Sequence, residues 1–167
     1  GAFSITPSSA LSEGSYSLTA KATDAAGNVS SASDSLSITI DATAPDAPTS
    51  LTTAATTTDD STPTITGSAE ANSTVKLYNG TTLLGSATAD SNGAFSITPL
   101  SALSDGDYSL TATATDAAGN VSFTSDSLSI TIDATAPDAP TSLSTSSAAK
   151  NSTPTISGTA EPNSTVT

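Results

Sequence analysis

The sequence predicts an all-β protein built from repeated domains, and three observations support this. Apolar residues recur at every second position, as in the run Tyr108, Leu110, Ala112 and Ala114. Turn-forming Asn, Asp and Gly residues separate such runs at regular spacing. The whole pattern then repeats along the chain. Agreement between these levels argues against a low-complexity disordered stalk, the alternative that a Ser-, Thr- and Ala-rich composition suggests.

The longest stretch that reads as one domain, residues 41–132, contains seven expected strands. They cover 49–55, 63–69, 74–78, 82–89, 94–98, 107–115 and 121–132. Asn79-Gly80 is expected to form a two-residue hairpin turn, because both residues tolerate positive φ. Loops are expected at 90–93 and 116–120, which are rich in Asp, Asn and Gly. Seven short strands without a helical stretch predict a two-sheet, immunoglobulin-like β-sandwich.

An internal repeat sets the domain organisation. Residues 1–51 align without gaps to residues 93–143, an offset of 92 that fits a whole small domain. Six positions differ: Ser8/Leu100, Glu13/Asp105, Ser15/Asp107, Lys21/Thr113, Ser31/Phe123 and Ala32/Thr124. We therefore assign residues 1–40 to the last three strands of one repeat, 41–132 to a complete repeat, and 133–167 to the first two strands of the next.

The linkers between these tandem sandwiches are short and contain proline. The segment from Asp41 to Pro48 recurs as Asp133 to Pro140, and two prolines in four residues favour a semi-rigid joint. Neighbouring repeats of the same chain are therefore the expected partners. Because the two partial repeats flank opposite ends of the complete one, we expect them to fray or to associate weakly head-to-tail between molecules.

One tyrosine sharpens the fold prediction. Tyr108 lies at the start of the expected sixth strand, where a hydroxyl that reaches back to the preceding loop makes the tyrosine corner of such sandwiches. Tyr16 occupies the same place in the first partial repeat. The alternative is an ordinary half-buried strand tyrosine.

Composition excludes several functions. The 167 residues include 16 acidic and 3 basic ones, for a net charge of −13, and no Cys, His or Trp. Zinc, haem and copper sites therefore lack their usual ligands, and Ser–His catalysis is impossible. With so few basic residues to contact phosphates, nucleic acid is not an expected partner. The sequence also has no run of about 18 apolar residues, so no membrane insertion is expected. We expect no enzyme, since a paired-carboxylate glycosidase site would need supporting aromatic residues.

The acidic residues fall mainly in the loops and linkers. In a seven-strand sandwich, one end of the complete repeat collects Asp41, Asp46, Glu70, Asn72, Asp90, Asn92, Asp116 and Asn120. These like charges would repel at the joint without a counter-charge. Ca²⁺ binds six to eight carboxylate, carbonyl and amide oxygens, which is the chemistry that the joint offers. The alternative is that these are solubilising turn residues.

Four stretches together resemble the bacterial immunoglobulin-like repeats of large surface adhesins, of the Bap-like and RTX-adhesin kind. They are DATAPDAPTSL, STPTITGSAEANSTV, VKLYNGTTLLGSATADSNGAFSITP and LSDGDYSLTATATDAAGNVS. The resemblance implies extracellular extender arms on the bacterial cell surface, used in biofilm formation or host attachment and stiffened by Ca²⁺ at the joints. By position it implies the ligands Asp41, Asp133, Asp24 and Asp116, to which Glu70, Glu161, Asp90, Asp46 and Asp138 are added as candidates.

A second class of function is a recognition module that binds a glycan or another copy of the repeat. Such a site usually needs an aromatic anchor or a pocket. Phe123, which replaces Ser31 of the first copy, is the candidate, although it could equally pack on its own sandwich.

Overall fold

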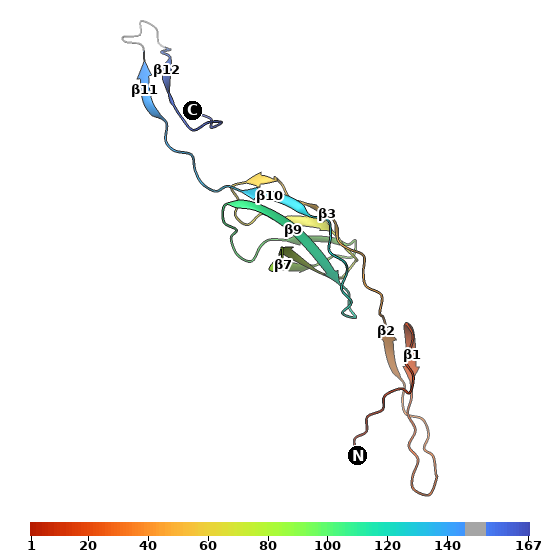
Figure 1. The fold of residues 1–167 in the computed structure, drawn as a ribbon. Coiled ribbons are helices and arrows are strands. Elements are labelled where there is room, and N and C mark those ends of the chain that lie inside the picture. Colours follow the sequence, from red (N-terminus) through yellow and green to blue (C-terminus); the bar gives the residue numbers. More distant parts are fainter. Residues whose placement is uncertain (146–152) are drawn as a thin grey trace.

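The computed structural model describes residues 1–145 and 153–167, in which all regular structure is β-strand. Figure 1 shows three units in a row: a two-stranded unit, a central sandwich and a second two-stranded unit. The first unit pairs β1 (Gly14–Leu18) with β2 (Leu36–Ile40), and the last pairs β11 (Thr141–Thr145) with β12 (Ile156–Thr159). No helix in these described ranges is long and apolar enough to cross a membrane.

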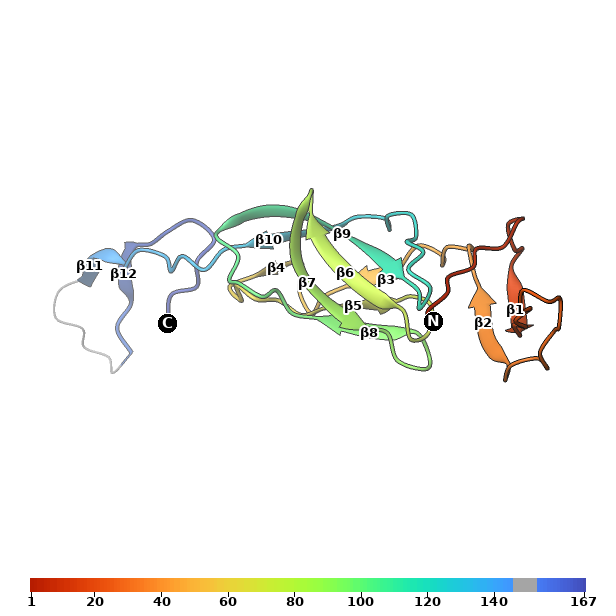
Figure 2. The same ribbon diagram turned by 90° about the horizontal axis from the view of Figure 1, so that it is seen from below.

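The central sandwich consists of two sheets. One has the order β3-β5-β8 and the other β4-β10-β9-β6-β7. Their bounds are β3 Thr49–Thr52, β4 Thr57–Thr58, β5 Ile65–Ser68, β6 Thr74–Asn79, β7 Thr82–Thr88, β8 Ala94–Ile97, β9 Gly106–Thr115 and β10 Leu128–Ile132. The long strand β9 runs along the sandwich from one joint towards the other, and β10 pairs with its first half (Figure 2). The predicted all-β, immunoglobulin-like architecture is confirmed.

The core follows the predicted alternation. Its fully buried side chains come from both sheets: Ile65, Val75, Leu77, Leu110, Ala112 and Ile132. Phe95 is the aromatic residue of this core, and it packs over Gly67, where an added Cβ would lie 2.6 Å from the Phe95 Cζ atom. The core therefore needs a glycine at position 67, because any side chain there would clash with the Phe95 ring.

The tyrosine corner is confirmed in both copies. The Tyr108 hydroxyl donates a hydrogen bond to the Ser104 carbonyl oxygen at 2.9 Å. Tyr16 makes the same bond to Ser12, also at 2.9 Å. The bond fixes the loop before β9, and before β1, to the strand that follows it.

The first strand of the complete repeat is shorter than predicted. The strand expected over 49–55 ends at Thr52, and the chain then crosses to the other sheet, where β4 pairs in parallel with β10. The crossing follows a bulge in β3, with Ser50 at φ 56°. Periodicity shows which face of a strand is buried, but it does not show which sheet edge the strand joins, so this switch could not be predicted from the pattern.

The predicted hairpin turn is displaced by one residue. Asn79 still pairs with Thr82 in the ladder, so the two turn residues are Gly80 and Thr81. Gly80 adopts φ 57°, whereas Asn79 keeps a negative φ. A register shift between Leu77 and Tyr78 accounts for the displacement, because it changes which residue reaches the end of the ladder.

The last strand of the complete repeat was predicted over 121–132, but regular pairing covers only β10, preceded by an isolated bridge between Thr115 and Val121. Between Val121 and the start of β10, two serine hydroxyls take the place of backbone carbonyls as hydrogen-bond acceptors. Ser122 Oγ accepts the Ala114 amide, and Ser125 Oγ accepts the Ala112 amide, both at 2.9 Å. Serine side chains that compete with the backbone in this way interrupt a regular ladder.

The strand expected near the start of the chain is absent. Residues 2–5 repeat the sequence of β8, yet they form no strand, and Phe3 and Ile5 are 78% and 74% exposed. In the central domain β8 pairs with β5. No described strand offers residues 2–5 such a neighbour, so the same sequence stays irregular.

Candidate joint site between the repeats

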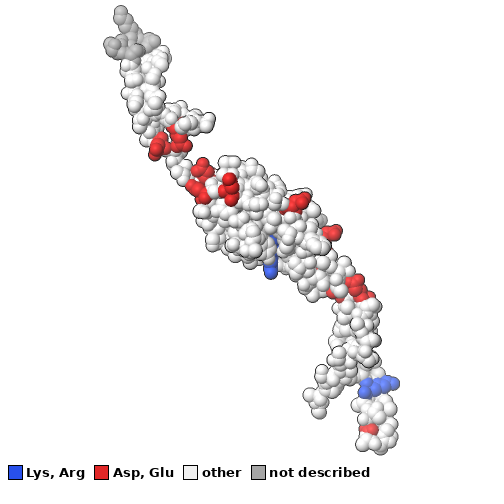
Figure 3. All heavy atoms as spheres, in the orientation of Figure 1, with Lys and Arg blue, Asp and Glu red and all other residues white. Residues whose placement is uncertain are grey.

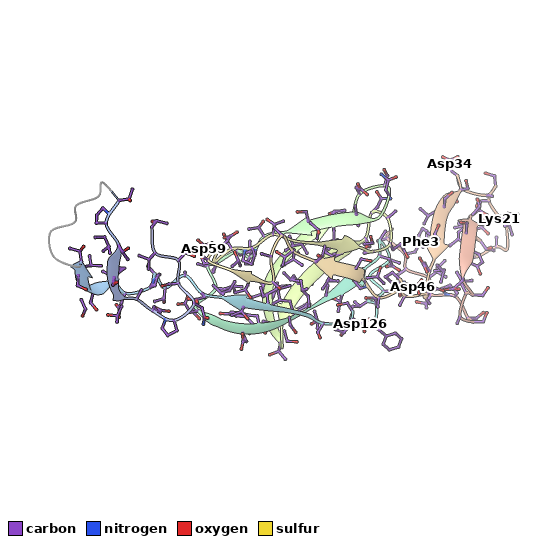
Figure 4. The ribbon with its side chains drawn as sticks, turned by 90° about the horizontal axis from the view of Figure 1, so that it is seen from above. Phe3, Lys21, Asp34, Asp46, Asp59 and Asp126 are labelled. Carbon is purple, nitrogen blue, oxygen red and sulfur yellow. The ribbon has the colours of Figure 1, made fainter. Side chains whose placement is uncertain are left out.

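Acidic side chains gather around the two linkers. Figure 3 shows the Asp and Glu atoms clustered where one unit gives way to the next. Figure 4 places Asp46 and Asp126 at the end of the sandwich near the first linker, and Asp59 at its other end. The positions of Asp46 and Asp59 agree with the prediction that most of the negative charge lies at the ends of the sandwich, whereas Asp126 was expected within the last strand and not at an end.

Three loops of the central domain meet at the end that faces the first linker. The Ala69 amide donates to the Gly93 carbonyl at 2.8 Å, which joins the β5–β6 and β7–β8 turns. The β9–β10 loop reaches the linker itself, since the Asn120 side-chain amide donates to the Asp41 carbonyl at 3.1 Å. The predicted convergence of the turns and the linker on one end therefore holds.

The β9–β10 loop is organised around the carboxylate of Asp116. Its Oδ1 accepts the backbone amides of residues 118, 119 and 120, and its Oδ2 accepts the Asn120 side-chain amide at 2.8 Å. These bonds, the Asn120 side chain first, lower the pKa of Asp116 below its ordinary value. Asp24 makes the corresponding bonds in the first unit, and its pKa is lowered for the same reason, the Asn28 side chain first.

The turn acids have local roles. Asp90 Oδ1 accepts the amides of Asn92 and Ala94 at 2.8 and 2.9 Å. Glu70 and Glu161 instead use their backbone carbonyls, each of which accepts both the amide and the hydroxyl of a serine three residues later. The Asp90 carboxylate thus has the turn-forming role that the sequence left open as an alternative to calcium binding, whereas the carboxylates of Glu70 and Glu161 take no part in these turn bonds.

The linker acids are exposed. Asp41 Oδ1 accepts the Thr43 amide at 3.1 Å, and Asp133 Oδ1 accepts the Thr135 amide at 3.3 Å. Asp46 and Asp138 are also exposed. The β1–β2 register pairs Gly14 with Ile40, which puts the Asp24 loop at the opposite end of its unit from Asp41. Asp41, Asp46, Glu70, Asp90 and Asp116 therefore belong to one joint, Asp133, Asp138 and Glu161 to the next, and Asp24 to neither.

The described side chains do not form a ready calcium site. Within residues 1–145 and 153–167, no three acidic side chains come close enough together to hold a metal ion. The Asp116 carboxylate is already engaged on both oxygens, and its partners are N–H donors. Calcium at the joints therefore stays a prediction.

Sequence reasoning missed the acid that contacts the linker most directly. Glu13 Oε1 accepts the Ala42 amide at 2.9 Å and the Thr43 hydroxyl at 2.7 Å. Asp105 makes the same pair of contacts at the second linker, with Ala134 and Thr135. The hydrogen bonds from Thr43 and Thr135 are the main cause that lowers the pKa of Glu13 and of Asp105. One feature of the sequence could have identified these residues: the position differs between the two copies, Glu13 and Asp105, yet is acidic in both.

Comparison with known proteins places this architecture in context. A family model described as a bacterial Ig-like domain matches residues 1–42 and 44–134. The chain is similar to a crystal structure of a tetra-tandem repeat in the extending region of a large adhesion protein, with 30% identity over 90% of this chain and 39% of that one, and a TM-score of 0.45. It is also similar to the BSP domain of a biofilm associated protein, with 25% identity over 76% of this chain and 20% of that one, and a TM-score of 0.43. The chain thus spans well under half the length of both structures, and the search of curated proteins found no match.

Proposed function

Because the chain belongs to the bacterial Ig-like domain family, as the match over residues 1–42 and 44–134 shows, we propose that it is a segment of an extender arm in a large bacterial cell-surface adhesin. In this role the repeats set the length of the arm and carry a binding region away from the cell. The resemblance of the four sequence stretches to adhesin repeats supports the extracellular setting.

The geometry of the first joint is the observation that carries the proposal. β2 ends at Ile40 and β3 begins at Thr49, so a short linker connects the last strand of one repeat to the first strand of the next. Within it, Pro45 and Pro48 are buried, whereas the matching Pro137 and Pro140 of the second linker are exposed. A linker that is partly buried, with φ fixed at two prolines, favours units that follow one another in line (Figure 1).

Small-angle scattering on proteins with three, four and five complete repeats tests the spacer role. We expect the maximum dimension to rise by the same increment with each added repeat. A maximum dimension that grows much more slowly than the number of repeats would show that the units fold back on one another, and the extender role would then be wrong.

Calcium is a separate part of the proposal. An excess of 16 acidic over 3 basic residues, concentrated near the linkers, is what supports it. An ion that binds the folded state alone raises the melting temperature, so titration with Ca²⁺ should stabilise a multi-repeat protein and EGTA should reverse the effect. Equal melting temperatures in Ca²⁺ and EGTA would remove calcium from the proposal and leave the spacer role intact.

Phe123 supports a second candidate function, recognition of a glycan or of another repeat. Its side chain is 90% exposed, so it does not pack on its own sandwich. The variant Phe123→Ser restores the residue that the first copy has at this position, and it is therefore a natural control. Binding to a glycan array or self-association that the wild-type chain shows and Phe123→Ser loses would favour recognition. The absence of both in the wild type would exclude it.

A further inference from the structure

We propose that a carboxylate in the loop before the sixth strand of each repeat, Glu13 in one copy and Asp105 in the next, clamps the following linker by direct hydrogen bonds that need no cation. The clamp makes the first linker residues an extension of the preceding repeat. It deepens the proposed spacer function, on which its biological meaning rests, by naming the contact that sets the direction of the arm.

The strand register delivers the carboxylate to the linker. In the first unit Gly14 pairs with Ile40, and in the central domain Gly106 pairs with Ile132. The residue before each glycine therefore lies beside the residues that follow the last strand. An acidic side chain at this position reaches the linker without any rearrangement of the loop.

The two copies reach the same contacts with side chains of different length. Glu13 uses one oxygen, Oε1, for both the Ala42 amide and the Thr43 hydroxyl. Asp105, one methylene shorter, uses Oδ1 for the Ala134 amide at 3.0 Å and Oδ2 for the Thr135 hydroxyl. Two different acids that satisfy the same two donors indicate that the contact depends on the carboxylate and not on one fortuitous geometry.

Other residues of the first linker are also held in place. The Asn120 side chain donates to the Asp41 carbonyl, and Pro45 and Pro48 are buried. The clamp fixes Ala42 and Thr43 to the preceding unit, which leaves Ala44 between two anchored segments. Each residue fixed in this way removes backbone freedom from the joint, and that freedom is what would let the arm bend.

The clamp residues are distinct from the predicted calcium ligands, so the two ideas separate experimentally. Neither Glu13 nor Asp105 belongs to the candidate ligand set. Glu13 Oε1 and both carboxylate oxygens of Asp105 face N–H or O–H donors, and a cation in the position of those donors would be repelled by their hydrogen atoms. The clamp therefore predicts a joint that stays ordered in EGTA.

The test uses the 167-residue chain, with hydrogen exchange of the Ala134 amide measured by NMR in EGTA. In Asp105→Ala the amide should exchange about tenfold faster than in the wild type, as expected for the loss of a charge-assisted hydrogen bond. Asp105→Glu installs the acid of the first copy and should keep the protection. Thr135→Val, which removes the hydroxyl donor, should have a smaller effect than Asp105→Ala.

The matched control is Asp126→Ala. It removes the same charge from the same domain, and the Asp126 carboxylate has no hydrogen-bond partner among the described residues. Circular dichroism melts should show that Asp105→Ala and Asp126→Ala leave the central domain equally folded. Protection at Ala134 that survives Asp105→Ala, or that EGTA alone abolishes in the wild type, would overturn the clamp.

The outcome also separates the clamp from the spacer role. If multi-repeat proteins lengthen linearly and Asp105→Ala leaves the Ala134 amide protected, the spacer stands and the clamp is wrong. If the amide loses protection in Asp105→Ala but multi-repeat proteins do not lengthen linearly, the clamp exists and the proposed function is wrong.

Discussion

Residues 1–40 and 93–132 have the same sequence at all but six positions, yet only the second copy contributes to the packed core. Phe95 is 4% exposed and its counterpart Phe3 is 78% exposed. Ile97 and Ile5 differ in the same way, at 2% and 74%. None of these residues is among the six differences, so local sequence does not explain the contrast.

Other features are the same in both copies. The tyrosine corner, the aspartate-centred loop, the serine hydroxyls that accept strand amides and the carboxylate on the linker all recur with matching partners. Each of these motifs joins residues within one loop, or within the antiparallel pair that both copies contain. The comparison therefore separates structure that a short segment builds for itself from structure that requires the rest of the domain.

The largest expected difference in stability is between variants of the two matching phenylalanines, Phe95 and Phe3. Phe95→Ala should destabilise the central domain by about 3–5 kcal/mol, because it removes a buried ring and leaves a cavity. Phe3→Ala should leave the unfolding of that domain unchanged, since its side chain is exposed. Urea unfolding followed by tyrosine fluorescence compares the two variants. Equal destabilisation by both would show that residues 1–7 also pack in a core.

The paired serines come next. Ser122 is 8% exposed, and its hydroxyl accepts the Ala114 amide. Ser122→Ala should cost about 1–3 kcal/mol, because a buried N–H loses its partner. Ser30→Ala removes the same local bond from Ala22 in an exposed setting, and it should not alter the central transition. A small effect of Ser122→Ala would indicate that water replaces the hydroxyl.

The tyrosine corner should have a smaller effect. Tyr108→Phe removes the hydroxyl bond to Ser104 and should destabilise the central domain by about 0.5–1.5 kcal/mol. Tyr16→Phe removes the matching bond in the first unit and should leave the central domain's melting temperature unchanged. Thermal melts of the two single variants and the double variant test this, with the double variant expected to match Tyr108→Phe alone.

The smallest effect concerns pH. Because hydrogen bonds lower the pKa of Asp116 below its ordinary value of 3.8, the folded state favours the charged carboxylate. The stabilisation is fully present well above pH 3.8 and is lost as the pH falls through the lowered folded pKa. NMR titration of the carboxyl carbons should give Asp24 and Asp116 similarly lowered values, because both loops have the same bonds. Two clearly different values would show that the loop is not a self-contained unit.

Much of the fold could be predicted because it rests on alternation. Ile65, Val75, Phe95 and Leu110 point inward as their period-2 patterns indicate. The crossing of the chain from β3 to β4 could not be predicted, since it depends on a parallel pairing with β10, far away in the sequence. The hairpin turn was misplaced by one residue for a related reason, a register shift that arises within the β6–β7 ladder.

The candidate site divides in the same way. The sequence indicated that acidic residues collect at the joints, and the structure has the loops around Asp90 and Asp116 at the positions that the sequence predicted. It did not identify Glu13 and Asp105, because their contacts with the linker depend on the register between two strands. That register brings together residues 29 and 30 positions apart.

By itself, the sequence determined the β-sandwich class, the repeat and the local motifs, since each needs only alternation, turn chemistry or a few neighbouring residues. Tertiary structure decided which copy of an almost identical segment becomes core, which sheet edge the first strand joins and which carboxylate holds the linker. The physical reason is that burial and cross-strand pairing require a partner surface from elsewhere in the chain, and identical residues behave differently where the described residues offer no such surface.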